Sequence, residues 1–429
     1  MSRVAVIGTG YVGLTTGACL AHLGHHVVCA DVDEAKIVRL QGGQIPIFEA
    51  GLEEMVQEQL RARRLSFVVG GATAVGDTEF VFLCVQTPQG ANGAADLTFV
   101  EQASHEIGPV LAAGAVVITK STVPVGSARV VEAALGRSDV SVVSNPEFLR
   151  EGQAVHDCLH PDRVVIGSDD KAAALRVAAL YESLDAPLIV TDPPTAETIK
   201  YACNAFLATK VSFINAIANL CQAVGADVRD VVLGMGYDKR IGFEFLKPGP
   251  GWGGSCFPKD SRALVRIAED HGYNFDLLKG VIAVNDEQFE QVVMRIERLA
   301  GRPLDGATIA VWGLTFKAGT DDLRDSPAVA VVRRLVERGA RVQAFDPTVS
   351  EALPAHAAHP SIEIYTGPYA ACAGAAVLAV LTEWDEFRWV DFAKVAELLE
   401  RPAIMDARNL LDPAALRRRG FQYESMGRS

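Results

Sequence analysis

Val4-Ala5-Val6-Ile7-Gly8-Thr9-Gly10-Tyr11-Val12-Gly13 is the stretch of sequence that decides the fold. Four consecutive apolar residues predict a buried strand, and the GxGxxG spacing after them predicts a tight turn into a helix. That helix is expected to stop at Gly24, and a second apolar strand, Val27–Ala30, ends at Asp31. Strand, glycines, helix, strand and a terminal acid in this order predict a dinucleotide-binding Rossmann unit. A plain strand-to-helix turn is the alternative.

The acid at the end of the second strand indicates which dinucleotide would bind. Glycines in the turn let a pyrophosphate approach the backbone at the helix N-terminus, while Asp31 would accept hydrogen bonds from the ribose hydroxyls. Val32-Asp33-Glu34 adds negative charge and no arginine, so a 2′-phosphate would be repelled. The sequence therefore predicts NAD rather than NADP. The turn residues expected to bind it are Gly8, Gly10, Tyr11, Val12 and Gly13.

Three more apolar runs, at 80–85, 115–119 and 140–143, predict further buried strands, each followed by a polar loop. In an open parallel sheet, the loops beyond the carboxyl ends of the strands line the ligand crevice. The loops 86–88, 121–124 and 145–151 are therefore expected to face the cofactor, although for any one of them ordinary loop polarity explains the sequence equally well. They contribute Thr87, Ser121 and Thr122 to the predicted cofactor site.

Composition limits the class of protein. A chain of 429 residues should form two or three domains, and 49% hydrophobic with 22% charged residues is typical of a globular protein. The net charge of −13 argues against nucleic acid or an anionic membrane as a partner. There is no signal-type segment and no uninterrupted apolar run long enough to span a bilayer, which predicts a cytoplasmic location.

Cysteine and histidine spacing gives no support for a metal site. The eight cysteines are scattered without a CxxC pair, and seven are interpreted as buried thiols and one as reactive. His156 and His160 have the i, i+4 spacing of a metal-binding pair, but Pro161 follows directly and no third ligand is evident. No metal is expected.

A long helix is predicted in the middle of the chain. Asp192-Pro193-Pro194 supplies a cap and first-turn prolines, and small and apolar residues continue to about Gly225. Such a helix is roughly 45 Å long, so it is expected to join domains and could supply a dimer surface. Lys200 and Asn204 lie one turn apart on one of its faces. A surface lysine beside a solvated asparagine is the alternative interpretation.

The run 248–260, PGPGWGGSCFPKD, contains four glycines and ends in a predicted helix start. Its backbone is expected to approach a ligand closely and to present Cys256 at the helix N-terminus, where a thiol is biased toward thiolate. Asp260 follows by four residues and could handle a proton on the same face. A plain turn with a small buried cysteine is the alternative.

The last third of the chain repeats the opening pattern. After a linker at 301–306, residues 307–312 predict a strand, and a helix from Ser326-Pro327 ends at Gly339. Asp346 follows Gly339 by seven residues, as Asp31 follows Gly24. This predicts a second Rossmann-like unit. Its first turn, 313–317, lacks GxGxxG and offers Lys317, which suits a substrate nucleotide better than a second dinucleotide.

Together these patterns predict an α/β chain with two Rossmann-like doubly wound domains joined by a long central helix and a helical dimerisation region. The expected domains are an NAD-binding domain at 1–191, a central helical region carrying Lys200, Asn204 and Cys256 at 192–300, and a domain for a substrate nucleotide at 301–429.

Eight motifs, in order along nearly the whole chain, give the sequence a specific family resemblance. They are GTGYVG, STVPVG, NPEFLREG, KYACNAFLA, DKRIG, GPGWGGSCFPKD, WGLTFKAGTDDLRDSP and MDARN. The chain resembles the UDP-glucose/GDP-mannose dehydrogenase family, and DKRIG and GPGWGGSCFPKD are most similar to its UDP-glucose branch. The resemblance implies a four-electron oxidation of a sugar C6 alcohol to a carboxylate, with two NAD⁺ used in turn and a thioester on the cysteine. It also implies that the central region carries the catalytic Lys, Asn and Cys and that 301–429 is a sugar-nucleotide (UDP)-binding domain.

The resemblance also implies roles for individual residues. Cys256 would be the nucleophile, while Lys200, Asn204 and Asp260 would handle the oxyanion and the proton. Glu147 and Thr122 would hold and activate the hydrolytic water, and Glu151 would lie beside the nicotinamide. Lys36, Glu151 and Arg324 are implied as cofactor contacts, although relatives often have Arg at the position of Lys36. Implied substrate contacts are Phe148, Leu149, Glu151, Lys200, Asn204, Phe243, Phe245, Lys247, Gly253, Phe316, Lys317 and Arg408, with Arg240 reaching the substrate from a neighbouring subunit of a homodimer.

Three alternatives remain open at the level of sequence. The same chemistry could act on GDP-mannose or a UDP-N-acetylhexosamine rather than UDP-glucose. A two-electron 3-hydroxyacid dehydrogenase shares the N-terminal fold and a Lys-x-x-x-Asn helix, but it requires neither the cysteine loop nor the second Rossmann unit. A catalytically silent sugar-nucleotide-binding protein would not need Cys256, Lys200, Asn204 and Asp260 together.

Overall fold

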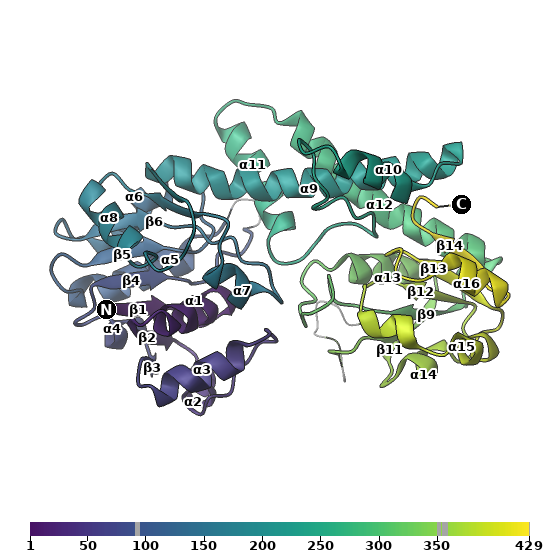
Figure 1. Cartoon of the computed structure of the whole chain (residues 1–429), viewed down its shortest axis with the longest axis horizontal. Helices are drawn as coiled ribbons and strands as arrows, with labels where there is room; N and C mark the ends of the chain where they lie inside the picture. Colours follow the sequence, from purple (N-terminus) through teal and green to yellow (C-terminus); the bar gives the residue numbers. More distant parts are fainter. Residues whose placement is uncertain (91–94, 350–352, 354–358, 429) are drawn as a thin grey trace. The chain divides into compact units, whose positions relative to one another are not determined.

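The computed structural model describes residues 1–90, 95–349, 353 and 359–428 (Figure 1). The chain divides into two compact units, one formed by 1–203 with 262–272 and the other by 204–261 with 273–429. Two helices run through the division: α9 (Pro193–Val224) and α11 (Phe257–Asp270). The three-domain division expected from the sequence stays a prediction.

The first unit is built on an eight-stranded sheet with the order β3-β2-β1-β4-β5-β6-β7-β8. The first six positions have the order of a dinucleotide-binding Rossmann sheet. Neighbouring strands are parallel except β6 and β7, which are antiparallel. The strands are β1 (Arg3–Ile7), β2 (His26–Asp31), β3 (Leu65–Val69), β4 (Phe80–Leu83), β5 (Val116–Thr119), β6 (Ser141–Ser144), β7 (Val164–Gly167) and β8 (Leu188–Thr191).

Helices cover both faces of this sheet, which explains the continuous apolar strands. Val4 and Val6 of β1 pack into one hydrophobic core, while Ala5 and Ile7, pointing the opposite way, pack into another. The first core takes residues from α1 (Tyr11–His22), α2 (Glu34–Gln41), α3 (Leu52–Arg61), α7 (Ala154–Leu159) and α8 (Lys171–Ala179). The second takes residues from α4 (Gly71–Ala74), α5 (Thr98–Ile107) and α6 (Ser127–Leu135), with the short 3₁₀ helix η1 (Gly108–Val110) after α5.

The second unit contains a six-stranded sheet in the order β11-β10-β9-β12-β13-β14, with every pair parallel. Counted from β9, this order is again 3-2-1-4-5-6, so the predicted second Rossmann-like unit is confirmed. Its strands are β9 (Thr308–Trp312), β10 (Arg341–Phe345), β11 (Ile362–Ile364), β12 (Val377–Val380), β13 (Ala403–Asp406) and β14 (Gln422–Ser425).

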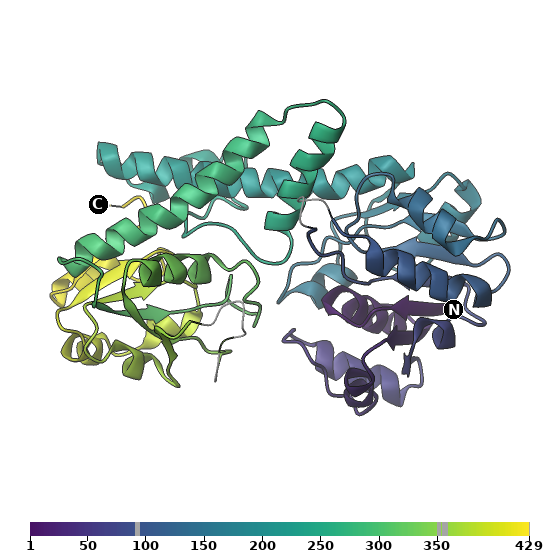
Figure 2. The ribbon, with the colours of Figure 1, turned by 180° about the vertical axis from the view of Figure 1, so that it is seen from behind.

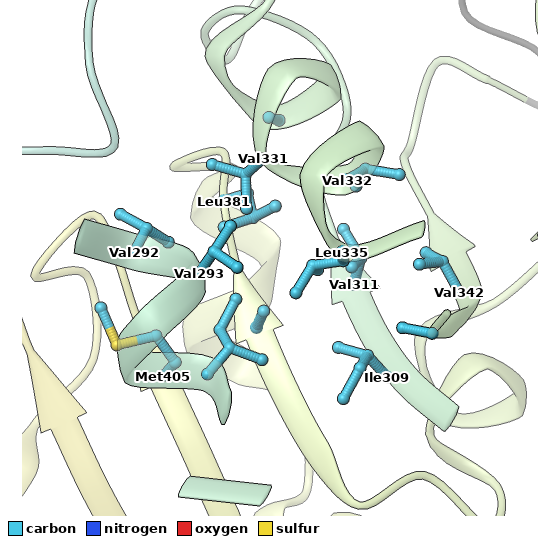
Figure 3. Packing of buried hydrophobic residues seen from close by; sticks show 14 of the residues in the cluster. Val292, Val293, Ile309, Val311, Val331, Val332, Leu335, Val342, Leu381 and Met405 are labelled. Carbon is cyan, nitrogen blue, oxygen red and sulfur yellow. The ribbon is translucent and has the colours of Figure 1, made fainter. Parts of the chain in front are cut away.

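Two long helices form the core on one face of the second sheet. Val292 and Val293 of α12 (Asp276–Ala300) meet Val331 and Leu335 of α13 (Pro327–Glu337) above Val311 of β9 (Figure 3). The view from behind shows α12 running along this sheet (Figure 2). The opposite face is covered by α14 (Pro368–Cys372), η2 (Asp385–Trp389), α15 (Phe392–Leu398) and α16 (Pro413–Arg418).

The two sheets repeat one turn after their first strand. Gly8 and Gly313 have φ of 98° and 89°, and each donates its N–H to the residue before the acid, Ala30 or Phe345. Asp31 accepts the N–H of Thr9, and Asp346 accepts those of Leu314 and Thr315. The units differ beyond this turn, because α1 begins at Tyr11 whereas α13 begins only at Pro327.

Residues near the end of the second unit are tied to its central helices. The N–H of Val228, at the start of α10 (Val228–Gly236), donates to the carbonyl of Gly427. A Cβ at Gly427 would lie 2.7 Å from the Cα of Ala218 on α9, so only glycine fits here. The Arg295 guanidinium of α12 donates to the carbonyl of Ser425. The last strand and the segment after it therefore complete the packing of α9, α10 and α12.

Within the described residues, α9 is the one helix long and apolar enough to cross a membrane by length and composition. Its most apolar 18-residue window has a mean hydropathy of 1.2 and is 33% buried. Lys210 interrupts it, and Ser212 and Asn215 are buried in it and hydrogen-bonded within the protein. These are features of a helix packed against protein, and the cytoplasmic location stays a prediction.

The first glycine turn makes a testable prediction about stability. A Cβ at Gly13 would lie 1.9 Å from the carbonyl oxygen of Gly8, whereas a Cβ at Gly10 would meet nothing within 4 Å. Gly13→Ala should therefore lower the melting temperature by several degrees, since overpacking typically costs about 1–3 kcal/mol. The matched variant Gly10→Ala should melt within about one degree of wild type. Equal losses in the two variants, measured by calorimetry, would contradict this account of the turn.

Candidate active site

The first turn of unit 1 forms an open cradle at a helix N-terminus. Gly8 needs its positive φ, and a Cβ there would come within 2.7 Å of the Cys84 carbonyl oxygen. Gly13 lets α1 approach the turn, while the space beside Gly10 is open. Free N–H groups at the start of α1 and open space beside the backbone fit a pyrophosphate group. The residues present therefore fit the predicted dinucleotide.

Asp31 lies at the carboxyl end of β2, where the predicted ribose contact belongs. Its Oδ2 accepts hydrogen bonds from the N–H of Thr9 (2.9 Å), the Thr9 hydroxyl (2.6 Å) and the Lys36 ammonium (3.0 Å). Burial acts to raise the pKa of Asp31, but these bonds hold it at about 2. The carboxylate is thus charged at any working pH. Lys36, predicted as a cofactor contact, is bonded to Asp31 and would act through it.

Tyr11 is anchored by an acid that the sequence did not reveal. Its hydroxyl donates to Glu49 Oε2 (2.5 Å) and to the Arg150 carbonyl (2.9 Å). Burial and Glu49 raise the pKa of Tyr11, so the phenol stays neutral. Glu49 also accepts the N–H groups of Gly152 and Ala154, and it therefore fixes the loop that carries Glu151. No motif surrounds Glu49, so only the fold could identify it.

Glu147 and Lys200 form a buried ion pair, with 6% and 4% of their surfaces exposed. Lys200 Nζ donates to Glu147 Oε1 at 2.8 Å and to the Glu147 carbonyl at 2.7 Å, while the N–H of Leu149 donates to Oε2. Burial acts to raise the pKa of Glu147, but Lys200, the N–H of Leu149 and Lys120 together outweigh it, and the net shift is downward. The Phe148 ring lies 5.5 Å from Lys200 Nζ and 3.7 Å from the Arg163 guanidinium.

The loops at the ends of β4 and β5 are fastened to each other. The Thr87 hydroxyl donates to the Thr122 carbonyl at 2.8 Å, and the Ser121 hydroxyl donates to the Val85 carbonyl at 2.5 Å. Thr87 and Thr122 are buried. The predicted cofactor-facing loops are thus held in place by their own hydroxyls.

Glu197 is a second buried acid that the sequence did not single out. It accepts the N–H groups of Gly126 (2.6 Å) and Ala128 (3.2 Å) at the start of α6, and the Ser144 hydroxyl at 3.0 Å. Burial raises the pKa of Glu197 despite these bonds. Glu197 lies three residues before Lys200 on α9, and that i, i+3 spacing was the available signal.

In unit 2, the loop before Cys256 is held by polar side chains of two helices. Asn285 of α12 exchanges hydrogen bonds with the backbone of Trp252, whose indole N–H donates to the Ser212 hydroxyl of α9 at 2.8 Å. Asn215 and Gln288 bond the N–H and the carbonyl of Gly249. The loop therefore has a fixed path.

The glycines of this loop are required by the protein's own packing. A Cβ at Gly251 would lie 2.6 Å from the Phe289 ring, one at Gly253 would lie 1.9 Å from the Asp325 carbonyl oxygen, and one at Gly254 would lie 2.9 Å from the Phe316 ring. The sequence suggested that these glycines let the backbone approach a ligand. That approach stays a prediction, and the structure adds a second requirement at Gly253, because the Asp325 carbonyl occupies the space where its side chain would be.

Cys256 lies directly before α11, as predicted. The N–H of Asp260 donates to the Cys256 carbonyl at 2.9 Å, which closes the first turn. Asp260 is 1% exposed and accepts hydrogen bonds from the Asn204 amide (2.6 Å) and the Lys259 ammonium (2.5 Å). Cys256 is half-buried, with its Sγ 3.5 Å from the Ser255 hydroxyl. The structure thus brings together Asn204, Asp260 and the start of the helix that presents Cys256.

Three predicted nucleotide contacts lie past the carboxyl ends of the second sheet. Arg408, after β13, donates to the carbonyls of Leu381 and Phe316 and pairs with Glu383 at 3.0 Å. Lys317, after β9, lies 5.4 Å from the ring of its neighbour Phe316. This is the edge at which open α/β sheets bind ligands. Arg324, predicted as a cofactor contact, forms a bidentate pair with Asp322.

The loop after α10 carries the remaining predicted substrate residues. Phe243 packs edge-on against Tyr237 at 5.4 Å, and Phe245 has a φ of 63° with its ring 6.1 Å from Phe257. Lys247 is exposed. The Arg240 guanidinium pairs with Asp238, and 89% of its side-chain surface is exposed. Phe243, Lys247 and Arg240 are therefore all exposed to solvent.

The described part of the chain contains no group of three His, Cys, Asp or Glu side chains that could hold a metal ion. Its candidate ligand-binding features are instead a glycine turn that fits a dinucleotide, in one Rossmann unit, and the sheet edge that carries Arg408 and Lys317, in the other. These features, with a cysteine at a helix start, define an NAD-dependent dehydrogenase with a second nucleotide-binding unit.

Comparison with known families gives the same class and refines it. Residues 2–185, 194–287 and 310–413 match the NAD binding domain, the central domain and the UDP binding domain of one family. The chain belongs to the UDP-glucose/GDP-mannose dehydrogenase family, as its motifs predicted, and NAD is its cofactor.

Individual relatives match over the full length. The chain is 45% identical to the UDP-glucose 6-dehydrogenase TuaD of Bacillus subtilis (strain 168), covering 100% of this chain and 94% of that protein. It is 46% identical to a UDP-glucose 6-dehydrogenase of Rhizobium meliloti (strain 1021), with 99% of both chains covered. A solved UDP-glucose dehydrogenase from Pyrobaculum islandicum is 38% identical with a TM-score of 0.91, over 100% of this chain and 98% of that one.

The charge at Asp31 predicts the choice of cofactor. A 2′-phosphate beside this carboxylate would be repelled or would leave it unpaired, at a cost of roughly 3 kcal/mol. The kcat/KM with NAD⁺ should therefore exceed that with NADP⁺ by at least about a hundredfold. Asp31→Asn should narrow the ratio, whereas Asp33→Asn, which removes a neighbouring charge, should change it less. Similar efficiencies with the two cofactors in the wild-type enzyme would remove Asp31 from this role.

Proposed function

We propose that this enzyme oxidises the C6 alcohol of UDP-glucose to the carboxylate of UDP-glucuronate in two steps at a cysteine. The observation that carries the proposal is Cys256 at the start of α11, followed one turn later by buried Asp260 in contact with Asn204. Full-length relatives named UDP-glucose 6-dehydrogenase support UDP-glucose as the sugar nucleotide. A UDP binding domain at 310–413 supports the uridine base.

The chemistry explains why a thiol is needed. Loss of a hydride and a proton converts the alcohol to an aldehyde, which has no second hydride to give until a nucleophile adds to it. The Cys256 thiolate adds to the aldehyde carbon, and loss of a hydride from the resulting thiohemiacetal leaves a thioester. Water then cleaves the thioester to a carboxylate and regenerates the thiol. NAD⁺, held by the glycine turn and Asp31, would supply the hydride acceptor for each oxidation, so two would be used per sugar.

Lys200, Asn204 and Asp260 are proposed to manage the charge and proton on the reacting oxygen. An ammonium and an amide one turn apart on α9 can both donate to an alkoxide as it forms. The carboxylate of Asp260 already accepts from Asn204, which fixes the amide with its remaining N–H available. Lys259, bonded to the other oxygen of Asp260, balances its buried charge.

Glu147 is proposed as the general base for thioester hydrolysis, with Thr122 holding the water. Its depressed pKa keeps it ionised, as a base must be before it takes a proton. Glu151 is proposed beside the nicotinamide, on the loop that Glu49 anchors.

The sugar nucleotide is proposed to bind through the residues that the family resemblance implies. The basic groups among them supply local positive charge on a chain whose net charge is −13. The proposed contacts are Phe148, Leu149, Phe243, Phe245, Lys247, Gly253, Phe316, Lys317 and Arg408, with Arg324 toward the cofactor.

Glu147→Gln tests the separation of oxidation from hydrolysis. If Glu147 mainly activates water, the variant should release a burst of up to two NADH per active site and then turn over slowly. A general base contributes about 10²- to 10⁴-fold, so the steady rate should fall by about that factor. Stopped-flow absorbance measures the burst, and intact-mass analysis in the slow phase should find the sugar nucleotide attached to Cys256.

Two controls make this test specific. Cys256→Ser should form no thioester and should lose net turnover, because an alkoxide is a poorer nucleophile and leaving group at neutral pH. If Glu147→Gln instead turns over slowly without a burst or an adduct, Glu147 acts before acylation. Counting NADH per sugar nucleotide in wild type also separates the alternatives, since a 3-hydroxyacid-type oxidation gives one and a silent binding protein gives none.

A homodimer is proposed on an apolar stripe of α9. Phe206, Phe213 and Leu220 recur every seven residues on this helix and are 64%, 51% and 56% exposed. A seven-residue apolar repeat keeps one helix face turned toward a partner helix. Two exposed small residues lie on the same face, Ala202 one turn before Phe206 and Ala216 between Phe213 and Leu220. Because the stripe is uncharged and self-complementary, a second copy of the chain is the proposed occupant.

The stripe predicts a change of oligomeric state. Phe213→Glu should convert dimers to monomers in analytical ultracentrifugation, since it places a charge in an apolar interface. Leu175→Glu is the matched control, because Leu175 is 67% exposed on α8 and lies outside the stripe. A monomeric wild-type protein, or an unchanged dimer in the Phe213 variant, would contradict the proposal.

Arg240 is proposed to serve the partner's substrate site, and complementation tests this. Cys256→Ser subunits lack the nucleophile but keep Arg240, whereas Arg240→Ala subunits keep the nucleophile but lack the arginine. If the arginine acts across the dimer, refolding equal amounts of both together should restore about a quarter of wild-type activity, because half the dimers are hybrids with one complete site. If Arg240 acts within its own subunit, mixing will restore nothing beyond the activity of the separate variants.

A further inference from the structure

Lys120, directly after β5, is a buried lysine for which the proposed reaction has no use. It is 9% exposed, and its Nζ donates to Asn145 Oδ1 at 3.0 Å and approaches the Tyr181 hydroxyl at 3.4 Å. Tyr181 in turn donates to the same Asn145 oxygen at 2.6 Å. Both of these partners are neutral. Buried lysines are rare unless a negative charge balances them, so its counter-charge must lie elsewhere.

Glu147 is the carboxylate whose negative charge acts on Lys120. Burial acts to lower the pKa of Lys120, but Tyr181, Cys158, Cys84 and Glu147, which face it, together raise it. Glu147 is the one of these four groups that is a carboxylate. The interaction is mutual, since Lys120 also contributes to the depressed pKa of Glu147, after the stronger effect of Lys200. The proposed general base therefore lies in the field of two buried ammonium groups.

Lys120 also determines where the Glu147 segment begins. Asn145 is fully buried, and its amide donates to the Val165 carbonyl of β7 at 2.7 Å while its backbone N–H donates to Thr119 of β5. The sequence placed Asn145 in a cofactor-facing loop, but its side chain is instead occupied by these internal bonds. Asn145 is two residues before Glu147, so the network around Lys120 fixes the strand end from which the carboxylate projects.

Lys200 has two tasks, and a second cation near Glu147 would allow it to perform both. In the structure Lys200 bonds Glu147, whereas catalysis requires it to donate to the substrate oxygen. A carboxylate that lost its only buried partner would be costly to keep charged. We propose that Lys120 is a positioning residue for Glu147, anchoring its strand end through Asn145 and supplying the cation that stays in place while Lys200 serves the substrate. This inference rests on the proposed role of Glu147.

Lys120→Met tests the proposal through the pH profile of kcat. Removing a positive charge raises the pKa of a nearby carboxylate, and the base must be ionised, so the acid limb of the profile should move to higher pH. Below that limb, each unit of displacement costs about tenfold in kcat, whereas at pH 9 kcat should recover to within about twofold of wild type. The KM values for NAD⁺ and UDP-glucose should stay within about twofold, because Lys120 contacts neither proposed site.

Control variants separate charge from packing. Lys120→Arg keeps the charge and should keep the wild-type acid limb, and Tyr181→Phe, which removes the other donor to Asn145, should leave that limb unmoved. A loss of kcat that is equal at every pH in Lys120→Met would make the residue purely structural and overturn the proposal. If the Met variant does not fold, Lys120→Arg provides the test. An acid limb that moves although the positive charge is retained would also overturn the proposal.

A double-mutant cycle distinguishes this inference from the proposed function. In the Glu147→Gln background, Lys120→Met should have almost no further effect on the steady rate, since both act on the same step. Additive losses would show that Lys120 acts elsewhere, even if Glu147→Gln gives its burst. Absence of the burst would instead refute the role of Glu147 itself, a result that is visible without any change at Lys120.

Discussion

The functional loops of this protein depend on buried carboxylates that bind their backbone N–H groups. A loop beyond the end of a parallel strand has no neighbouring strand to bond, and buried donors without partners are costly. Three buried acids accept such N–H groups, each at a different strand end: Asp31, Asp346 and Glu197. Glu49 does the same for the loop that carries Glu151. These acids hold the backbone in place, which leaves nearby side chains to contact ligands.

Sequence patterns identified the parts of the site that are local. The turn at Gly8, the acid at Asp31 and its repeat at Asp346 could be predicted, because glycine spacing and strand ends lie within a few tens of residues. Glu49 could not be predicted from the sequence, because its partners Gly152 and Ala154 are more than a hundred residues away. For Glu197 the i, i+3 spacing from Lys200 was a local signal, but its bond to Gly126, 71 residues away, could not be predicted. A buried acid between distant loops leaves no periodic pattern.

The cysteine loop shows a second limit of sequence. Its glycines indicated an unusual backbone correctly, but the packing that requires them could not be predicted. Gly251, Gly253 and Gly254 are needed because Phe289, Asp325 and Phe316 occupy the space where their side chains would be. The requirement is set by distant residues of the second unit. Precision at the thiol therefore comes from packing behind the loop, and the Rossmann unit supplies part of that packing.

The contacts between Gly427 and the central helices bear on how the chain is made. Val228 bonds the Gly427 carbonyl, and Ala218 fits against its bare Cα. A ribosome that adds about 5–20 residues per second reaches Gly427 roughly 10 to 40 seconds after Val228. Until then α9 and α10 lack part of their packing, with the apolar stripe of α9 already outside the ribosome. The first unit can fold during synthesis, whereas the second must wait, so the nascent chain spends this interval in need of protection from aggregation.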